Sequence, residues 1–156
     1  MKRLICIYMF LLSFGFSINV TSGGTVSNNQ LSIDIKHYDI RLKVDTKRQM
    51  ISGYVDIKLK ILEEIRFIEL DLINQYFISK VLIDSVSTPF KHRKNKIFIT
   101  PQGARANSTI SVRVVYKGKP PKAEKPPWSG GFTWEKSNDG YPWVGLSCQG
   151  NGAQIW

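Results

Sequence analysis

Apolar and polar residues alternate along much of this chain, which is the pattern of strands that bury one face. The alternation starts at Ile33, shifts by one residue at His37, and then continues to Val44. A polar turn over residues 45–49 separates it from a second alternating run over residues 51–61. We predict that these two runs pair as one long β-hairpin.

Shorter runs of the same kind follow at residues 67–72, 77–83, 97–99 and 108–116. Their inward-facing members are predicted to include Val81, Ile83, Ile110, Val112, Val114 and Tyr116. No segment shows the 3.6-residue period of a helix across three turns. Short strands joined by turns predict an all-β fold, an antiparallel β-sandwich or a related curved double sheet.

The first residues have the layout of a secretory signal peptide rather than of a strand. A basic start at Lys2 and Arg3 precedes an apolar run over residues 4–16, and small polar residues follow. Cleavage is expected after Ser22, with Ser17 as the second choice. The run is shorter than the roughly twenty residues that span a bilayer, so a membrane anchor is the less favoured alternative. We expect removal of residues 1–22, no stable membrane span afterwards, and a periplasmic, extracellular or cell-surface product.

The rest of the chain, residues 23–156, is long enough for one domain with a core. Residues 118–128 hold four prolines and are expected to form a semi-rigid connection, because proline lacks the N–H that helices and sheets need. Residues 129–156 are dense in glycine and aromatic residues and read as the lining of a site. Because the chain ends on Trp156 within that segment, we expect a longer protein.

Charge does not indicate a nucleic-acid partner, although the chain carries a net charge of +10. Without the two basic residues of the signal region, 20 basic and 12 acidic residues leave a net charge of +8. The one basic cluster, residues 91–96, lies between two apolar runs and has no interleaved aromatic residues. It therefore predicts a solvated hairpin turn, and we predict no nucleic-acid binding.

The residues that usually carry catalysis are scarce. The two histidines, His37 and His92, are too far apart in sequence for the helical HExxH zinc site, which needs two histidines four residues apart. Cys148 is the only cysteine after the signal region, so no cysteine-rich zinc site is available. We expect His37 to be a packed strand residue, His92 to be exposed and Cys148 to be buried. No catalytic or metal-binding residue is predicted.

Five stretches carry a resemblance to a known family when they are taken together and in order. They are residues 37–42, 51–57, 68–72 and 115–120, and then residues 131–134 with 148–153 and Trp156. These stretches resemble the amino-terminal domain of the aminopeptidase N and leukotriene hydrolase family of zinc metallopeptidases. The resemblance covers roughly residues 36–156, which correspond to the first domain of such an enzyme only.

The resemblance implies a β-sandwich that caps a catalytic domain and helps to recognise substrate. In the family, the loop matching Cys148, Gln149 and Gly150 reaches the active site, and the position of Gln149 binds the free amino group of a peptide. A side-chain oxygen can accept hydrogen bonds from an ammonium group, which suits that role. Judged from its neighbours alone, Gln149 would instead satisfy backbone groups within a loop.

The chain departs from the family because the HExxH motif and the distant glutamate ligand are missing from it. The resemblance therefore implies an exported zinc metallo-aminopeptidase whose zinc is held by a missing catalytic domain. Residues 1–156 alone are expected to have no hydrolase activity. The alternative is a freestanding secreted β-sandwich binding module without enzymatic activity.

Overall fold

The computed structural model describes residues 25–156 except 102 and 104, so the predicted signal region lies outside the described residues. A five-stranded antiparallel sheet has the order β1-β2-β8-β4-β5. Its strands are β1 (Ile33–Asp45), β2 (Met50–Ile61), β8 (Thr109–Gly118), β4 (Tyr76–Ile83) and β5 (Val86–Ser87). This sheet contains four of the six strands that the sequence predicts.

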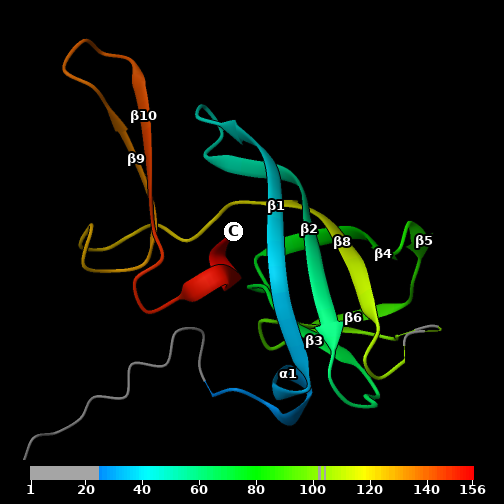
Figure 1. The fold of residues 1–156 in the computed structure, drawn as a ribbon. Helices are drawn as coiled ribbons and strands as arrows, with labels where there is room; N and C mark the ends of the chain where they lie inside the picture. The colour runs from blue at the N-terminus through cyan, green and yellow to red at the C-terminus, as the bar shows by residue number, and fades with distance from the viewer. Residues whose placement is uncertain (1–24, 102, 104) are drawn as a thin grey trace, which may run out of the picture.

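Two smaller antiparallel sheets complete the fold. One has the order β3-β7-β6, with β3 (Ile68–Asp71), β7 (Lys96–Ile99) and β6 (Phe90–Arg93), and the other pairs β9 (Gly131–Lys136) with β10 (Pro142–Ser147). Two single turns of helix are α1 (Asn28–Leu31) and η1 (Gly152–Ile155). In Figure 1 the three-stranded sheet lies against the large one, whereas the β9–β10 hairpin stands away from both and the C-terminal segment returns to them.

The predicted long hairpin is confirmed, including its irregularity. β1 pairs with β2 from Ile33 opposite Ile61 to Asp45 opposite Met50, and the register shifts between Ile35 and His37. That shift is the one-residue change of pattern seen in the sequence, because a bulge moves the following side chains to the other face.

The core lies between the five-stranded and three-stranded sheets and is mainly aliphatic. All six side chains predicted to point inward are buried: Val81, Ile83, Ile110, Val112, Val114 and Tyr116. The apolar face of β1 is different, because Ile40 is 45% exposed and Val44 is 44% exposed. An open groove of about 340 Å³ separates these side chains from Val144 and Leu146 of β10.

The basic cluster forms a hairpin turn, as the sequence predicts. β6 pairs with β7, and Lys94 and Asn95 at the tip have φ angles of 52° and 59°. These left-handed conformations are typical of a two-residue hairpin turn. His92 is only half-buried there, and its Nε2 lies 2.9 Å from the carbonyl oxygen of Leu72, so the expectation of an exposed side chain is wrong.

Two other expectations about single residues are wrong as well. His37 is exposed rather than packed, because the bulge places it on the outer face of β1. Cys148 is exposed rather than buried, because it lies on the turn after β10 and not on a strand.

Sequence patterning also misses α1, because a single helical turn is too short to show a period. Ser27 caps it through a hydrogen bond from the Gln30 backbone N–H to its hydroxyl, and the Gln30 side chain bonds back to the Ser27 N–H. In the part of the chain that the structure describes, no helix has the length and apolar character needed to cross a membrane.

Candidate functional site

The residue predicted to contact substrate, Gln149, lies on a tight turn between β10 and η1. The carbonyl oxygen of Cys148 accepts hydrogen bonds from the N–H groups of Asn151 and Gly152, at 3.1 and 3.0 Å. Gly150 has a φ of 72°, a conformation that glycine adopts without strain. The side chain of Gln149 is exposed, and its backbone N–H donates to the Ser147 hydroxyl at 3.4 Å.

The strand side of this turn is held by the β9–β10 hairpin and the Pro-rich connection. Ser147 lies opposite Gly131 in the β9–β10 pair, and its hydroxyl donates to the carbonyl oxygen of Pro127 at 2.9 Å. At Gly130, a Cβ atom would lie 2.5 Å from the carbonyl oxygen of Gln149 and 2.1 Å from the side-chain nitrogen of Asn151. The turn therefore packs so closely on Gly130 that no larger residue fits there.

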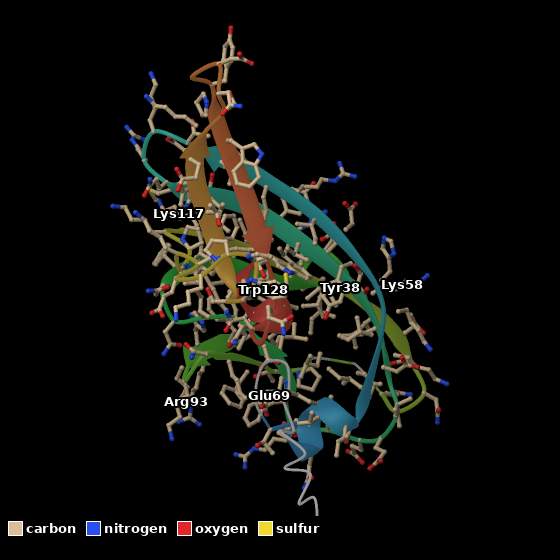
Figure 2. All side chains as sticks on the ribbon, turned by 90° about the vertical axis from the view of Figure 1, so that its left-hand side faces the viewer. Tyr38, Lys58, Glu69, Arg93, Lys117 and Trp128 are labelled. Carbon is tan, nitrogen blue, oxygen red and sulfur yellow. The ribbon has the colours of Figure 1, made fainter. Side chains whose placement is uncertain are left out.

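The other side of the turn is held by the core of the sandwich. The N–H of Ile73 donates to the carbonyl oxygen of Gln154 at 3.0 Å, and the Tyr76 hydroxyl donates to the carbonyl oxygen of Ile155 at 2.6 Å. Ile155 is 1% exposed, and Trp156 meets Tyr38 edge-to-face with ring centroids 5.3 Å apart. Figure 2 shows Tyr38 beside this C-terminal segment.

The arrangement fixes the backbone at Gln149 from both ends and leaves its side chain facing solvent. Among the described residues, no hydrogen bond is made by the Gln149 side-chain amide. A free amide can offer one oxygen as acceptor and one NH₂ group as donor, and it carries no charge. It can bind or orient a polar group, but it cannot serve as an acid, a base or a nucleophile.

The described residues do not fit a zinc ion. Within residues 25–156, leaving out 102 and 104, no three His, Cys, Asp or Glu side chains come together in a way that could hold a metal. His37 lies on the outer face of β1, and His92 faces the carbonyl oxygen of Leu72. Any zinc chemistry would therefore need ligands from outside this part of the chain.

A polar cluster that sequence reasoning misses joins α1 to the three-stranded sheet. Lys96 lies 3.1 Å from a carboxylate oxygen of Glu69 and 2.8 Å from one of Asp71, and it donates to the Gln30 side chain at 2.9 Å. Asn29 donates to Glu69 at 3.1 Å, and Gln30 donates to Asp71 at 2.9 Å. The alternation of Glu69 and Asp71 with apolar residues gave no sign that a carboxylate would be buried.

Glu69 is the most buried member of this cluster, with only 4% of its surface exposed. Burial alone raises the pKa of Glu69, but hydrogen bonds from Asn29, Ser27 and Lys96, together with the Lys96 charge, bring that pKa below its ordinary value. Burial alone lowers the pKa of Lys96, but Asp71 and Glu69 raise it above its ordinary value. Each group thus stabilises the charged form of the other.

A partly open pocket of about 220 Å³ borders the cluster between the two sheets. Tyr38, Tyr116 and Trp156 line it together with Glu69 and Asp71. Because the carboxylates already have partners within the protein, we assign them a structural role in holding α1 and β3 together.

Comparison by sequence alone finds no matching family profile and no curated protein that is similar at a significant level. Comparison of structures does find relatives of the fold. The chain is similar to yeast leukotriene A4 hydrolase in complex with bestatin, at 20% identity and a TM-score of 0.65 over 87% of this chain. Native leukotriene A4 hydrolase from Saccharomyces cerevisiae gives 20% identity and a TM-score of 0.64 over 86%.

A third similar structure is a mutant M1 zinc metallopeptidase from Deinococcus radiodurans bound to a Tyr-Ser-Ala substrate, at 20% identity and a TM-score of 0.54 over 81% of this chain. The matches span only 22% of each hydrolase chain and 28% of the metallopeptidase chain. The chain therefore has the all-β sandwich fold of the amino-terminal domain of the M1 zinc metallopeptidases and leukotriene A4 hydrolases.

Proposed function

We propose that this chain is the substrate-recognition and capping domain of an exported zinc metallo-aminopeptidase, with the zinc held by residues outside residues 1–156. The observation that carries the proposal is the turn at Gln149. Its backbone is anchored to β9 and to the core, while its amide is exposed. Such a group is suited to meet a ligand presented by a neighbouring domain.

The chemistry of the proposed contact follows from the amide. Its oxygen can accept a charge-assisted hydrogen bond from the free ammonium group at the amino terminus of a peptide. The N–H of an internal peptide bond is neutral and makes a weaker hydrogen bond. The similar structures support this class of ligand, because one of them is bound to a Tyr-Ser-Ala substrate. Recognition of the amino terminus would restrict cleavage to the end of a chain.

Export rests on the signal-peptide layout of residues 1–22. It is part of the proposal, and the amino-terminal sequence of the protein recovered from its native source tests it. A start after Ser22 or Ser17, in protein recovered from outside the cytoplasm, is the expected result. An intact Met1 in cytoplasmic protein would contradict export.

The functional test uses the zinc enzyme that contains this domain, with Gln149→Ala compared with Gln154→Ala. Gln154 lies five residues on, in η1, and is tied to the core through its backbone oxygen. We expect Gln149→Ala to raise KM for a peptide with a free amino terminus by about tenfold, as for a lost charge-assisted hydrogen bond. Bound zinc and the behaviour of Gln154→Ala should stay as in the wild type.

Unchanged kinetics in Gln149→Ala would refute the substrate role. Zinc-dependent hydrolysis by the purified 156-residue chain alone would refute the claim that the catalytic groups lie elsewhere. If no peptidase activity accompanies the chain in its native source, the alternative of a freestanding binding module is favoured.

A further inference from the structure

Within the described part of the chain, the outer edge of β1 is a long strand edge without a partner. β1 is the outermost strand of the five-stranded sheet and has 13 residues. Among the described residues its backbone hydrogen bonds only with β2. At the opposite edge of the same sheet, β5 has only two residues. Long free edges are templates for pairing with another strand, and short ones are not.

The apolar face of this edge strand is unusually open. Tyr38 is 37% exposed, and Ile40 and Val44 are 45% and 44% exposed. Figure 2 shows the length of β1 that carries Tyr38 at the side of the molecule. An open apolar face next to unpaired backbone groups is typical of a surface that binds by adding a strand.

The outer face of the same segment carries charges of both signs. Asp39 and Arg41 form an exposed salt bridge at 3.0 Å, and their side chains are 41% and 64% exposed. Two residues further along the strand, Lys43 lies on the same face. Because Asp39 and Arg41 are two residues apart on this face, each can lie opposite the other's counterpart in a copy that runs in the opposite direction.

We propose that two copies of this chain associate through their β1 edges as a two-fold antiparallel pair, with Ile40 opposite Ile40 of the second copy. In this register Asp39 lies opposite Arg41 of the second copy, and the reverse pair forms by symmetry. Tyr38 then lies opposite Leu42 on the apolar face. The two five-stranded sheets become one continuous sheet.

The charges favour this register over its neighbours. A two-fold antiparallel pair keeps side chains on their faces only when its axis passes through a residue, and the three axes nearest this charged pair pass through Asp39, Ile40 or Arg41. Centring on Asp39 places that carboxylate opposite its own copy. Centring on Arg41 brings Asp39 opposite Lys43 but places two guanidinium groups opposite each other. Like charges directly opposite destabilise a strand pair, and of these three registers only the one centred on Ile40 avoids both like-charge pairs.

The test measures the mass of the full chain in solution by sedimentation velocity over a range of concentrations. The chain has a mass of 17.8 kDa, and we expect a reversible shift toward twice that value as concentration rises. Asp39→Arg and Arg41→Asp should each weaken association by about tenfold, because each converts the two reciprocal pairs into like-charge pairs. The double variant Asp39→Arg with Arg41→Asp should restore it, because the pairs form again with reversed polarity.

Two substitutions of an exposed apolar residue by lysine separate the effect of position from the general loss of surface hydrophobicity. Ile40→Lys places two like charges at the two-fold axis and should leave the chain monomeric. Val86→Lys makes a similar change at the opposite edge of the sheet, where Val86 is 63% exposed, and should associate as the wild type does.

A wild-type chain that stays monomeric at every concentration would overturn the proposal. Equal association by all variants would overturn it too, because another part of the chain, such as residues 1–24, would then be responsible. Failure of the double variant to recover, with circular dichroism showing a folded protein, would overturn the Ile40 register.

Discussion

The absence of a side chain at Gly130 lets the turn that carries Gln149 lie against the start of β9. The φ angle of Gly130 is not in the left-handed region, so the constraint is one of space alone. A single methyl group would meet both the carbonyl oxygen of Gln149 and the side chain of Asn151. The position of Gln149 therefore depends on a residue nineteen positions earlier.

We predict that Gly130→Ala displaces this turn and lowers the free energy of unfolding by about 1–3 kcal/mol, which is typical of overpacking. Adding Asn151→Ala should recover only part of the loss, because the backbone oxygen of Gln149 still blocks the methyl group. Urea unfolding measures the loss, and the amide NMR signals of residues 148–151 report the displacement. Wild-type stability and unchanged signals in Gly130→Ala would contradict the described packing.

The hydroxyl groups of two neighbouring buried tyrosines have different roles. The Tyr76 hydroxyl donates to the carbonyl oxygen of Ile155 at 2.6 Å, whereas the Tyr116 hydroxyl has no hydrogen-bond partner among the described residues. Their ring centroids are 5.2 Å apart, and burial raises the pKa of both above the ordinary value. The two tyrosines are therefore buried in the same environment and differ mainly in whether the hydroxyl group has a hydrogen-bond partner.

Tyr76→Phe should therefore cost about 1–2 kcal/mol of unfolding free energy, because it leaves the Ile155 carbonyl unsatisfied. Tyr116→Phe should be neutral or slightly stabilising, because it removes a buried hydroxyl that gains nothing from the protein. Urea unfolding of the two variants side by side checks this. Equal losses would show that the Tyr76 hydrogen bond does not anchor the C-terminal segment.

At the scale of elements, α1 and the three-stranded sheet are joined by ionised side chains rather than by apolar contact alone. Glu69 is buried, Lys96 is its charged partner, and both have pKa values shifted toward the charged form. Glu69 contributes stability above its ordinary pKa of 4.5, and that contribution is lost as the pH falls through its lowered value in the folded protein. Lys96 contributes below its ordinary pKa of 10.5, and its share is lost as the pH rises through its raised folded value.

Lys96→Met should cost roughly 2–3 kcal/mol near neutral pH, because it leaves the Glu69 charge buried without its partner. The loss should shrink as Glu69 becomes protonated in acid, since a neutral carboxyl needs no counter-charge. Lys36→Met, which removes an exposed salt bridge to Asp34, should cost about 0.5 kcal/mol or less. Chemical denaturation of both variants across the acid range tests this, and a pH-independent loss in Lys96→Met would exclude the Glu69 explanation.

Periodicity was enough to predict β1, β2, β4 and β8 of the main sheet, because apolar and polar residues alternate along most of each strand. The bulge near His37 was visible because it reverses the alternation. By contrast, β6, β9 and β10 have only four to six residues each and are rich in basic residues, glycine or aromatic residues, so their patterns are too short to mark a strand. α1 depends on a capping box around Ser27, a local hydrogen-bond motif that carries no period.

For the candidate site, the sequence indicated the residue Gln149 but not the contacts that hold its turn in place. Gln149 was singled out through a family resemblance, whereas its anchors at Tyr76 and Gly130 come from distant parts of the chain. Cys148 shows the limit of residue preferences, because cysteine is buried in most proteins and this thiol is exposed on the same turn. Contacts between segments decide such details, and a single sequence does not display them.

At the scale of the whole molecule, the fold matches the first domain of much longer zinc enzymes, with 22–28% of their chains covered. The described residues bring together no group of side chains that could hold a metal. Our proposal is consistent with both findings: this sandwich would recognise and cap the substrate, and a further domain would supply the catalytic groups. Gln149 would then face that domain.

The most direct test is to sequence the native transcript beyond the codon for Trp156. Our account predicts that the reading frame continues into an HExxH motif followed by a distant glutamate, which would supply the two histidines and the carboxylate of a zinc site. A stop codon directly after Trp156 would contradict it, because the product would then lack the ligands that the proposed function requires.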